Sequence, residues 1–154
     1  MSKKNTPPGS VFLVPLRDTG YGIGVMARNT GNGDCLGYFF GPRVDDAAKA
    51  SLDGIQPDCA VLVGFFGDLD LIRGTWIVIG EMNSWKAENW PVPEMVRIVD
   101  GKAILSAYDD NLQFVGEREI SLSESSLYPR DRMMGSGAVE IRLTKLIGDE
   151  AATA

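Results

Sequence analysis

The sequence predicts an α+β fold that is rich in strands: a strongly curved antiparallel sheet or a small open barrel, with one central helix and a C-terminal helix. Three observations support this prediction. Short apolar segments are separated by turn signals along most of the chain. One segment near the middle has helical apolar spacing. Glycines occupy one face of an early strand, where they permit a sharp bend or the close approach of a neighbour. A β-sandwich is the alternative arrangement.

The first strand is expected at Val11–Leu16, which is apolar on both faces. A turn at residues 17–20 leads to the glycine-bearing strand Tyr21–Arg28, and residues 29–34 form a loop of residues that tolerate positive φ. Asp100 and Gly101 are a strong signal for a tight hairpin. The remaining strands are expected at Cys35–Phe40, Cys59–Phe66, Thr75–Ile79, Met95–Val99, Ala103–Tyr108 and Leu112–Ser121.

The central helix is expected at Val44–Leu52, where apolar residues recur at three- and four-residue spacing. Asp45 and Asp46 suit the positive, N-terminal end of the helix dipole, and Gly54 suits the C-terminal end of the helix. Asp68 and Asp70 are expected in a solvated turn.

The end of the chain fits two patterns. Val139, Ile141 and Leu143 alternate with polar residues as in a strand, whereas Val139, Leu143, Leu146 and Ile147 fit one face of a helix. The apolar pair Leu146 and Ile147, about one helical turn after Leu143, favours the helix. The expected organisation is a flexible polar arm (1–9), a single globular domain (10–147) and a frayed tail (148–154).

Composition indicates a cytoplasmic protein. There is no apolar run near 18 residues, and the N-terminal segment is too short for the apolar region of a signal peptide. Cys35 and Cys59 lie in apolar, strand-like segments, which is typical of small buried side chains in an unexported chain.

The net charge of −6 is concentrated in the middle third of the chain. Residues 1–43 carry +3, residues 44–94 carry −6 and residues 95–154 carry −3. An acidic field repels phosphate backbones and attracts basic partners, although acidic side chains also serve solubility alone. Nucleic acid and membrane are therefore not expected as partners.

The chain contains no histidine, which removes the usual general base at neutral pH and the commonest metal ligand. Gly20, Gly22 and Gly24 lack the spacing of a dinucleotide-binding loop and the lysine of a P-loop. Asp68 and Asp70 lack the calcium-loop pattern. We therefore expect no enzyme, no cofactor and no metal, and we nominate no catalytic residue.

The tryptophans divide into two groups. Trp76 lies in an apolar strand, where a core position is natural, whereas Trp85 and Trp90 lie in a polar, proline-bearing loop. Loop tryptophans either cap the edge of a core or anchor a partner. The candidate partner-binding residues combine these aromatics with the acidic segment: Asp45, Asp46, Asp68, Asp70, Trp85, Glu88 and Trp90.

Two stretches resemble the immunity protein 26 family of bacterial polymorphic-toxin systems. The first is Pro8–Leu16 followed by Tyr21–Val25, and the second is Gly74–Gly80 with Pro91 and Pro93 downstream. Together they span Pro8–Val99. The resemblance implies a bacterial protein that binds a cognate toxin and neutralises it by occluding its active site, without catalysis. The acidic segment suits a basic toxin such as a nuclease. The oligomeric state stays open.

Two other functions are compatible with the residues. One is a small-barrel module that binds a small ligand, with Tyr21, Trp76, Trp85 and Trp90 lining a pocket. The other is a carboxylate-based hydrolase using Asp68, Asp70 or Glu81, which requires two carboxyl groups about 5–9.5 Å apart in one cleft.

Overall fold

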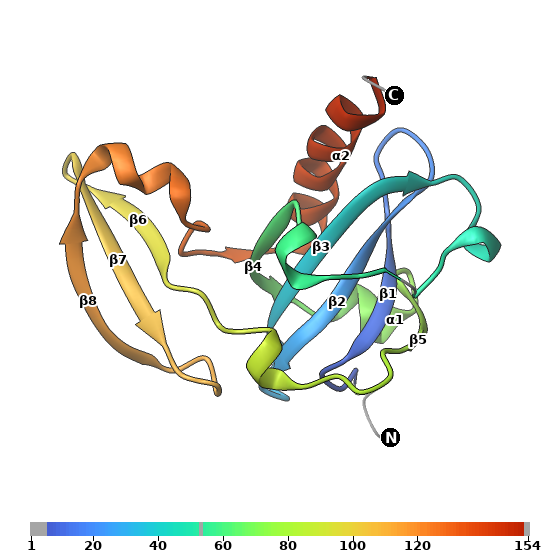
Figure 1. The fold of residues 1–154 in the computed structure, drawn as a ribbon, viewed down its shortest axis with the longest axis horizontal. Coiled ribbons are helices and arrows are strands. Elements are labelled where there is room, and N and C mark those ends of the chain that lie inside the picture. The colour runs from blue at the N-terminus through green and yellow to red at the C-terminus, as the bar shows by residue number, and fades with distance from the viewer. Residues whose placement is uncertain (1–5, 53, 153–154) are drawn as a thin grey trace.

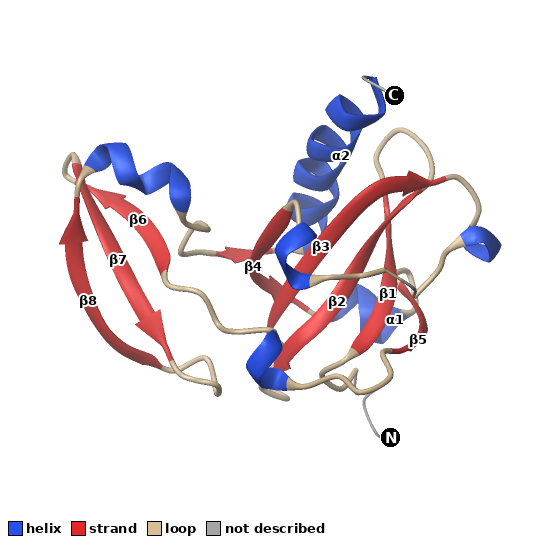
Figure 2. Ribbon diagram, viewed as in Figure 1, coloured by secondary structure: helices blue, strands red, loops and turns tan. Residues whose placement is uncertain are grey.

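The computed structural model describes residues 6–52 and 54–152, the last four of these as backbone only. Figures 1 and 2 show two sheets lying side by side, with a long helix over one of them. The strands are β1 (Ser10–Pro15), β2 (Tyr21–Asn29), β3 (Asp34–Val44), β4 (Leu62–Gly67), β5 (Ile77–Glu81), β6 (Met95–Val99), β7 (Lys102–Tyr108), β8 (Phe114–Ile120) and β9 (Met133–Met134). The helices are α1 (Leu69–Arg73) and α2 (Ser136–Ala152), with short 3₁₀ helices η1 (Ala47–Lys49), η2 (Pro57–Cys59), η3 (Ala87–Asn89) and η4 (Leu122–Leu127).

The larger sheet has six strands in the order β5-β1-β2-β3-β4-β9. Its neighbours are antiparallel except for β9, which runs parallel to β4 and pairs only with Phe65 and Phe66. Side chains alternate between the two faces of a strand, so each face has its own core.

One face of the six-stranded sheet packs against α2 and α1. Its core contains Phe12, Phe39, Phe66 and Trp76, whose rings lie 5.5–6.4 Å apart in stacked, tilted and edge-to-face pairs. Gly24 makes this possible, because a Cβ there would lie 2.4 Å from the ring of Phe12. The glycine face of β2 therefore serves close approach rather than a sharp bend.

The other face is covered by two loop segments rather than by a regular helix. Residues 44–52, 54–60 and 82–93 lie against an apolar layer that includes Leu13, Val25 and Tyr38. Trp90 closes this layer: its side chain is 3% exposed and meets Tyr38 edge to face at 5.0 Å.

The smaller sheet has three antiparallel strands in the order β6-β7-β8, with η4 over one face. Its own small core consists of Val96, Ala103, Leu105 and Ile120, with Tyr128 packed against it. Asp100 (φ 50°) and Gly101 (φ 77°) both have left-handed backbones in the β6–β7 turn, as the predicted tight hairpin requires.

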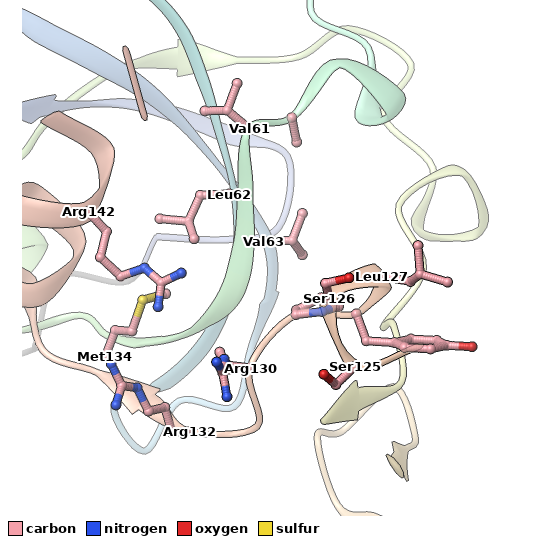
Figure 3. A pocket seen from close by; sticks show the side chains of 13 residues that line it. Val61, Leu62, Val63, Ser125, Ser126, Leu127, Arg130, Arg132, Met134 and Arg142 are labelled. Atoms are coloured by element: carbon pink, nitrogen blue, oxygen red, sulfur yellow. The ribbon is translucent and has the colours of Figure 1, made fainter. Parts of the chain in front are cut away.

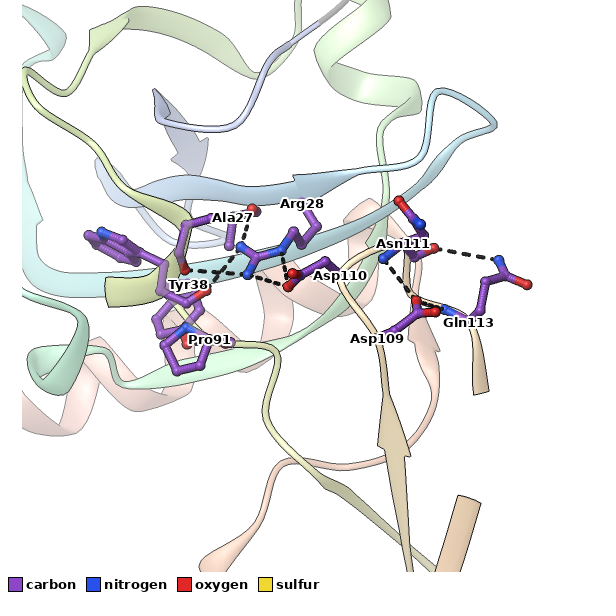
Figure 4. Close-up of polar contacts among 10 residues, drawn as sticks. Ala27, Arg28, Tyr38, Pro91, Asp109, Asp110, Asn111 and Gln113 are labelled. Carbon is purple, nitrogen blue, oxygen red and sulfur yellow. Dashed lines mark hydrogen bonds and ion pairs between the residues drawn. The ribbon is translucent and has the colours of Figure 1, made fainter. Parts of the chain in front are cut away.

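Backbone, aromatic and ionic contacts join the two sheets. The backbone of Val96 exchanges hydrogen bonds with Pro129 and Asp131, on the segment that returns to β9. The ring of Tyr108 packs edge to face on Phe65 at 4.9 Å. Arg28 of β2 bonds to Asp110 in the β7–β8 turn (Figure 4).

The expected α+β, strand-rich class and the C-terminal helix are confirmed, but the barrel is not. Within residues 6–52 and 54–152 the six-stranded sheet stays open, with β5 and β9 as separate edges, and it is not strongly curled. The glycines of β2 serve packing instead: Gly24 lies against the ring of Phe12, and Gly22 lies against Leu143 of α2.

The prediction of a central helix at Val44–Leu52 is wrong. Val44 ends β3, and only Ala47–Lys49 form a single 3₁₀ turn, capped by Asp46, whose carboxylate accepts a hydrogen bond from Ala48 N. Three of the five side chains in the predicted stripe are small (Ala47, Ala48 and Ser51), and none of the residues in the 3₁₀ turn is buried. Packing of a small apolar face stabilises too little to extend a helix.

A helix was missed after β4. The segment expected as a solvated turn is the start of α1, which buries Leu71 and ends at Gly74 in the left-handed conformation (φ 83°). Elsewhere the predicted strands occur within a few residues of their expected bounds, apart from the unexpected two-residue β9.

At the ends of the chain, residues 1–5 of the predicted arm and residues 153–154 of the predicted tail lie outside the described residues. Gly9 N donates to Met26 O and Thr6 is buried, so residues 6–9 lie against the sheet. Residues 148–152 continue α2. None of the helices formed by the described residues has the length and apolar character to cross a membrane.

Candidate functional site

A cleft of about 490 Å³ lies between the two sheets (Figure 3). One wall is formed by residues 60–63, where the chain enters β4, and the other by residues 125–129 at the end of η4. Arg130, Arg132 and Arg142 complete the lining together with Met134. We call this hollow the arginine cleft.

A second hollow of about 480 Å³ shares the same three arginines. It adds Arg97 and Asp131 and the edge of β6. The three guanidinium groups are therefore accessible from both hollows.

The arginine cleft is basic although the protein carries a net charge of −6. Within the described part of the chain, Arg130, Arg132 and Arg142 have no ion pair. Five other arginines each pair with a carboxylate: Arg17 with Glu140, Arg28 with Asp110, Arg43 with Asp18, Arg97 with Glu117 and Arg118 with Glu94. An unpaired guanidinium presents a planar set of donors suited to a carboxylate or a phosphate.

Asp131 stands between two of these arginines in sequence but is engaged elsewhere. One of its carboxylate oxygens accepts a hydrogen bond from the Tyr108 hydroxyl at 2.6 Å, and the other lies 3.5 Å from Arg97. Burial, together with this hydrogen bond to Asp131, raises the pKa of Tyr108 to about 12. Asp131 lines the second hollow but not the arginine cleft, and its carboxylate is already engaged by Tyr108 and Arg97.

One wall of the arginine cleft is an open sheet edge. On the side of β4 away from β3, β9 pairs only with Phe65 and Phe66, so in the described residues Leu62–Gly64 have no neighbouring strand there. An open edge presents unpaired backbone donors and acceptors that can pair with another extended chain.

The residues that the sequence nominated for partner binding do not gather in one place. Asp45 and Asp46 are exposed on the segment that covers one face of the six-stranded sheet. Asp68 and Asp70 are half-buried at the start of α1, which packs on the opposite face. The sheet therefore separates the two carboxylate pairs.

Trp85, Glu88 and Trp90 lie on the loop that carries η3. Trp90 is buried, and Trp85 is half-buried with its ring against Gly9. The indole N–H of Trp85 is buried without a hydrogen-bond partner in the described residues. Both rings thus cap the edge of the core, whereas Glu88 is exposed.

The geometry does not support a single aromatic pocket. Trp76 belongs to the core under α2, and Trp90 belongs to the core on the other face of the sheet, so they cannot line one cavity with Tyr21. Among the described residues, no three Cys, Asp or Glu side chains gather in an arrangement that could hold a metal ion.

Sequence reasoning missed the arginine cleft. The available signal was Arg130 and Arg132 flanking one aspartate, in a stretch without clear periodicity. Their proximity to Arg142 and to the start of β4 depends on how the chain returns from the three-stranded sheet to α2, which local sequence patterns do not encode.

Comparison with known proteins gives one match. Residues 7–102 match the family model of immunity protein 26, which is more than half of the chain. Neither the curated proteins nor the solved structures contain a match. The matched range contains both stretches that carry the resemblance in the sequence. The chain therefore belongs to the immunity protein 26 family, which implies neutralisation of a cognate polymorphic toxin by a protein without catalytic activity of its own.

Proposed function

We propose that this chain neutralises its toxin by direct binding, with the toxin seated over the arginine cleft and its active site covered. The observation that supports this most is the convergence of Arg130, Arg132 and Arg142 without a carboxylate partner in the described residues. Unpaired cations are costly to bring together, since like charges repel, and a bound acidic group relieves that repulsion.

The surroundings of the cleft suit an interface between proteins. A stable complex buries about 800 Å² on each partner, which is more than the cleft alone supplies. Leu127, 75% exposed, and Met133, 48% exposed, lie on or beside the cleft and offer apolar surface to a partner. An apolar centre ringed by polar groups is the usual anatomy of such an interface.

The acidic residues nominated from the sequence have a separate role in the proposal. Asp45, Asp46 and Glu88 are exposed, and with Asp68 and Asp70 they contribute to the negative field of residues 44–94. A field of this sign accelerates encounter with a basic toxin such as a nuclease without requiring contact at each residue. In this proposal Trp85 is half-buried beside the acidic surface. Trp90 is buried beneath it and contributes to the core rather than to toxin contact.

Co-expression with a candidate toxin encoded by a neighbouring gene tests the proposal. We expect the chain to protect cells from that toxin and to co-purify with it at a fixed stoichiometry. Occlusion predicts that the toxin's substrate competes with the chain for binding. Protection without a stable complex would contradict direct binding, and a complex that leaves the toxin's activity intact would contradict occlusion.

A further inference from the structure

The open edge of β4 and the arginines lie in the same cleft, and together they specify what the cleft binds. Leu62 and Val63 form a strand edge without a neighbouring strand in the described residues, and Arg130, Arg132 and Arg142 line the same hollow (Figure 3). We propose that the arginine cleft binds an extended acidic segment of the toxin, which adds a strand to β4 and pairs its carboxylates with these arginines. This inference rests on the proposed function.

The backbone on the cleft wall favours a polypeptide. Strand addition uses main-chain hydrogen bonds along an exposed edge, with side chains of the added strand entering pockets on alternate positions. Here the edge reaches the cleft at Leu62 and Val63, and Val61 and Leu127 supply apolar contacts on the two walls. β9 already occupies the rest of this edge, so an added segment would continue the sheet in line with it.

The charge distribution favours an acidic segment. Arg73 is the one arginine outside the cleft that has no ion pair among the described residues; Arg130, Arg132 and Arg142, the others without one, all line the cleft. No carboxylate of the described residues lines the cleft itself. Carboxylate is therefore the group that this lining lacks, and a planar guanidinium binds it with two parallel hydrogen bonds.

A nucleic-acid backbone is also anionic, but it fits the molecule less well. A chain of net charge −6 repels a polyanion that extends beyond the cleft. A phosphate backbone also lacks the peptide groups that would pair with the open edge of β4. A short acidic peptide segment uses both the edge and the arginines.

Charge reversal tests the inference. Binding of the toxin against which the chain protects, inactivated in its own active site, would be measured for wild type, Arg130→Glu, Arg132→Glu and the control Arg73→Glu. Arg73 is exposed on α1, so the control makes the same change in net charge away from the cleft. Circular dichroism and thermal unfolding establish that each variant is folded. We expect each cleft variant to weaken binding about tenfold or more and Arg73→Glu to change it less than about twofold.

Hydrogen exchange of the complex provides a readout of strand addition. Amides within residues 60–66 should exchange more slowly when toxin is bound, because an added strand pairs with the open edge. Cleft variants that bind as tightly as Arg73→Glu, or unchanged exchange over residues 60–66, would overturn the inference while leaving toxin binding intact.

The remaining outcomes are also decisive. A wild-type chain that does not bind the toxin overturns the proposed function and this inference with it. Retardation of a 20-nucleotide RNA or DNA by the free chain, lost in Arg132→Glu and kept in Arg73→Glu, would make the cleft a phosphate site instead. Self-association of the free chain, lost in the same variant, would make the occupant a second copy.

Discussion

The indole N–H of Trp76 donates a hydrogen bond to a carboxylate oxygen of Glu140 at 2.9 Å. Trp76 immediately precedes β5, at one edge of the six-stranded sheet, and Glu140 lies in the first turns of α2. The other oxygen of Glu140 lies 3.2 Å from Arg17, in the turn between β1 and β2. One carboxylate thus fixes the position of α2 over the sheet.

Glu140→Ala should destabilise the fold by about 1–3 kcal/mol, because it leaves the buried indole N–H of Trp76 without an acceptor. Glu140→Gln keeps an acceptor and loses only the ion pair with half-exposed Arg17, so it should cost less than about 1 kcal/mol. Urea unfolding followed by tryptophan fluorescence measures both. Equal losses for the two variants would show that the ion pair dominates.

Gly24→Ala should destabilise by about 1–3 kcal/mol, since its Cβ would lie 2.4 Å from the ring of Phe12 in a packed core. Gly116→Ala in β8 is the matched control. A Cβ there meets nothing within 4 Å, so stability should stay constant or rise by about 0.5–1 kcal/mol. The measurement is the free energy of unfolding in urea; a Gly24→Ala variant as stable as wild type would contradict the close approach.

Arg28→Leu should cost about 2–4 kcal/mol. The guanidinium of Arg28 donates to the carbonyls of Ala27 and Trp90, which stay buried and unpaired in the variant (Figure 4). Asp110→Asn removes only an exposed partner and should cost less than about 1 kcal/mol. Thermal unfolding measures the stability of the two variants. A larger loss of stability for Asp110→Asn than for Arg28→Leu would contradict this prediction.

The two cysteines should differ in reactivity. Cys59 is exposed and Cys35 is buried in the core. Burial, together with the nearby carboxylates of Asp68 and Asp34, raises the pKa of the Cys35 thiol to about 12. At pH 8 a colorimetric thiol reagent should titrate one thiol in the folded protein and two in denaturant. Two fast thiols in the folded protein would contradict the burial of Cys35.

Alkaline pH should destabilise the fold. The folded-state pKa values of Cys35 and Tyr108, both about 12, lie above their ordinary values of 9.0 and 10.0. Their stabilising contribution is therefore complete below about pH 9 and declines as pH rises toward 12. Urea midpoints between pH 7 and pH 11 should fall from about pH 9 onward. Cys35→Ala should show a shallower fall.

Local patterns predicted most strands and α2, because alternation, turn residues and apolar spacing are short-range signals. The tight β6–β7 turn followed from Asp100 and Gly101 alone. The helix at Val44–Leu52 failed because alanines satisfy the spacing without supplying area to bury, and α1 was missed because five residues give no usable periodicity.

The site was less predictable than the fold. Trp85 and Trp90 stood out in sequence because large aromatics in a polar loop are unusual, yet the structure places them at the core edge. Arg130 and Arg142 look ordinary in sequence, since a surface arginine is common. They become notable only when tertiary structure brings them together without a carboxylate partner in the described residues.

The two walls of the arginine cleft come from different parts of the chain. Residues 60–63 fall inside the range shared with the immunity protein 26 family, which ends at residue 102, at the start of β7. Residues 125–129 and the three arginines fall after it. Under the proposed function, a substitution in the second wall changes which toxin is recognised while the shared scaffold of β1–β5 keeps its geometry, so specificity and foldability would vary independently in this chain.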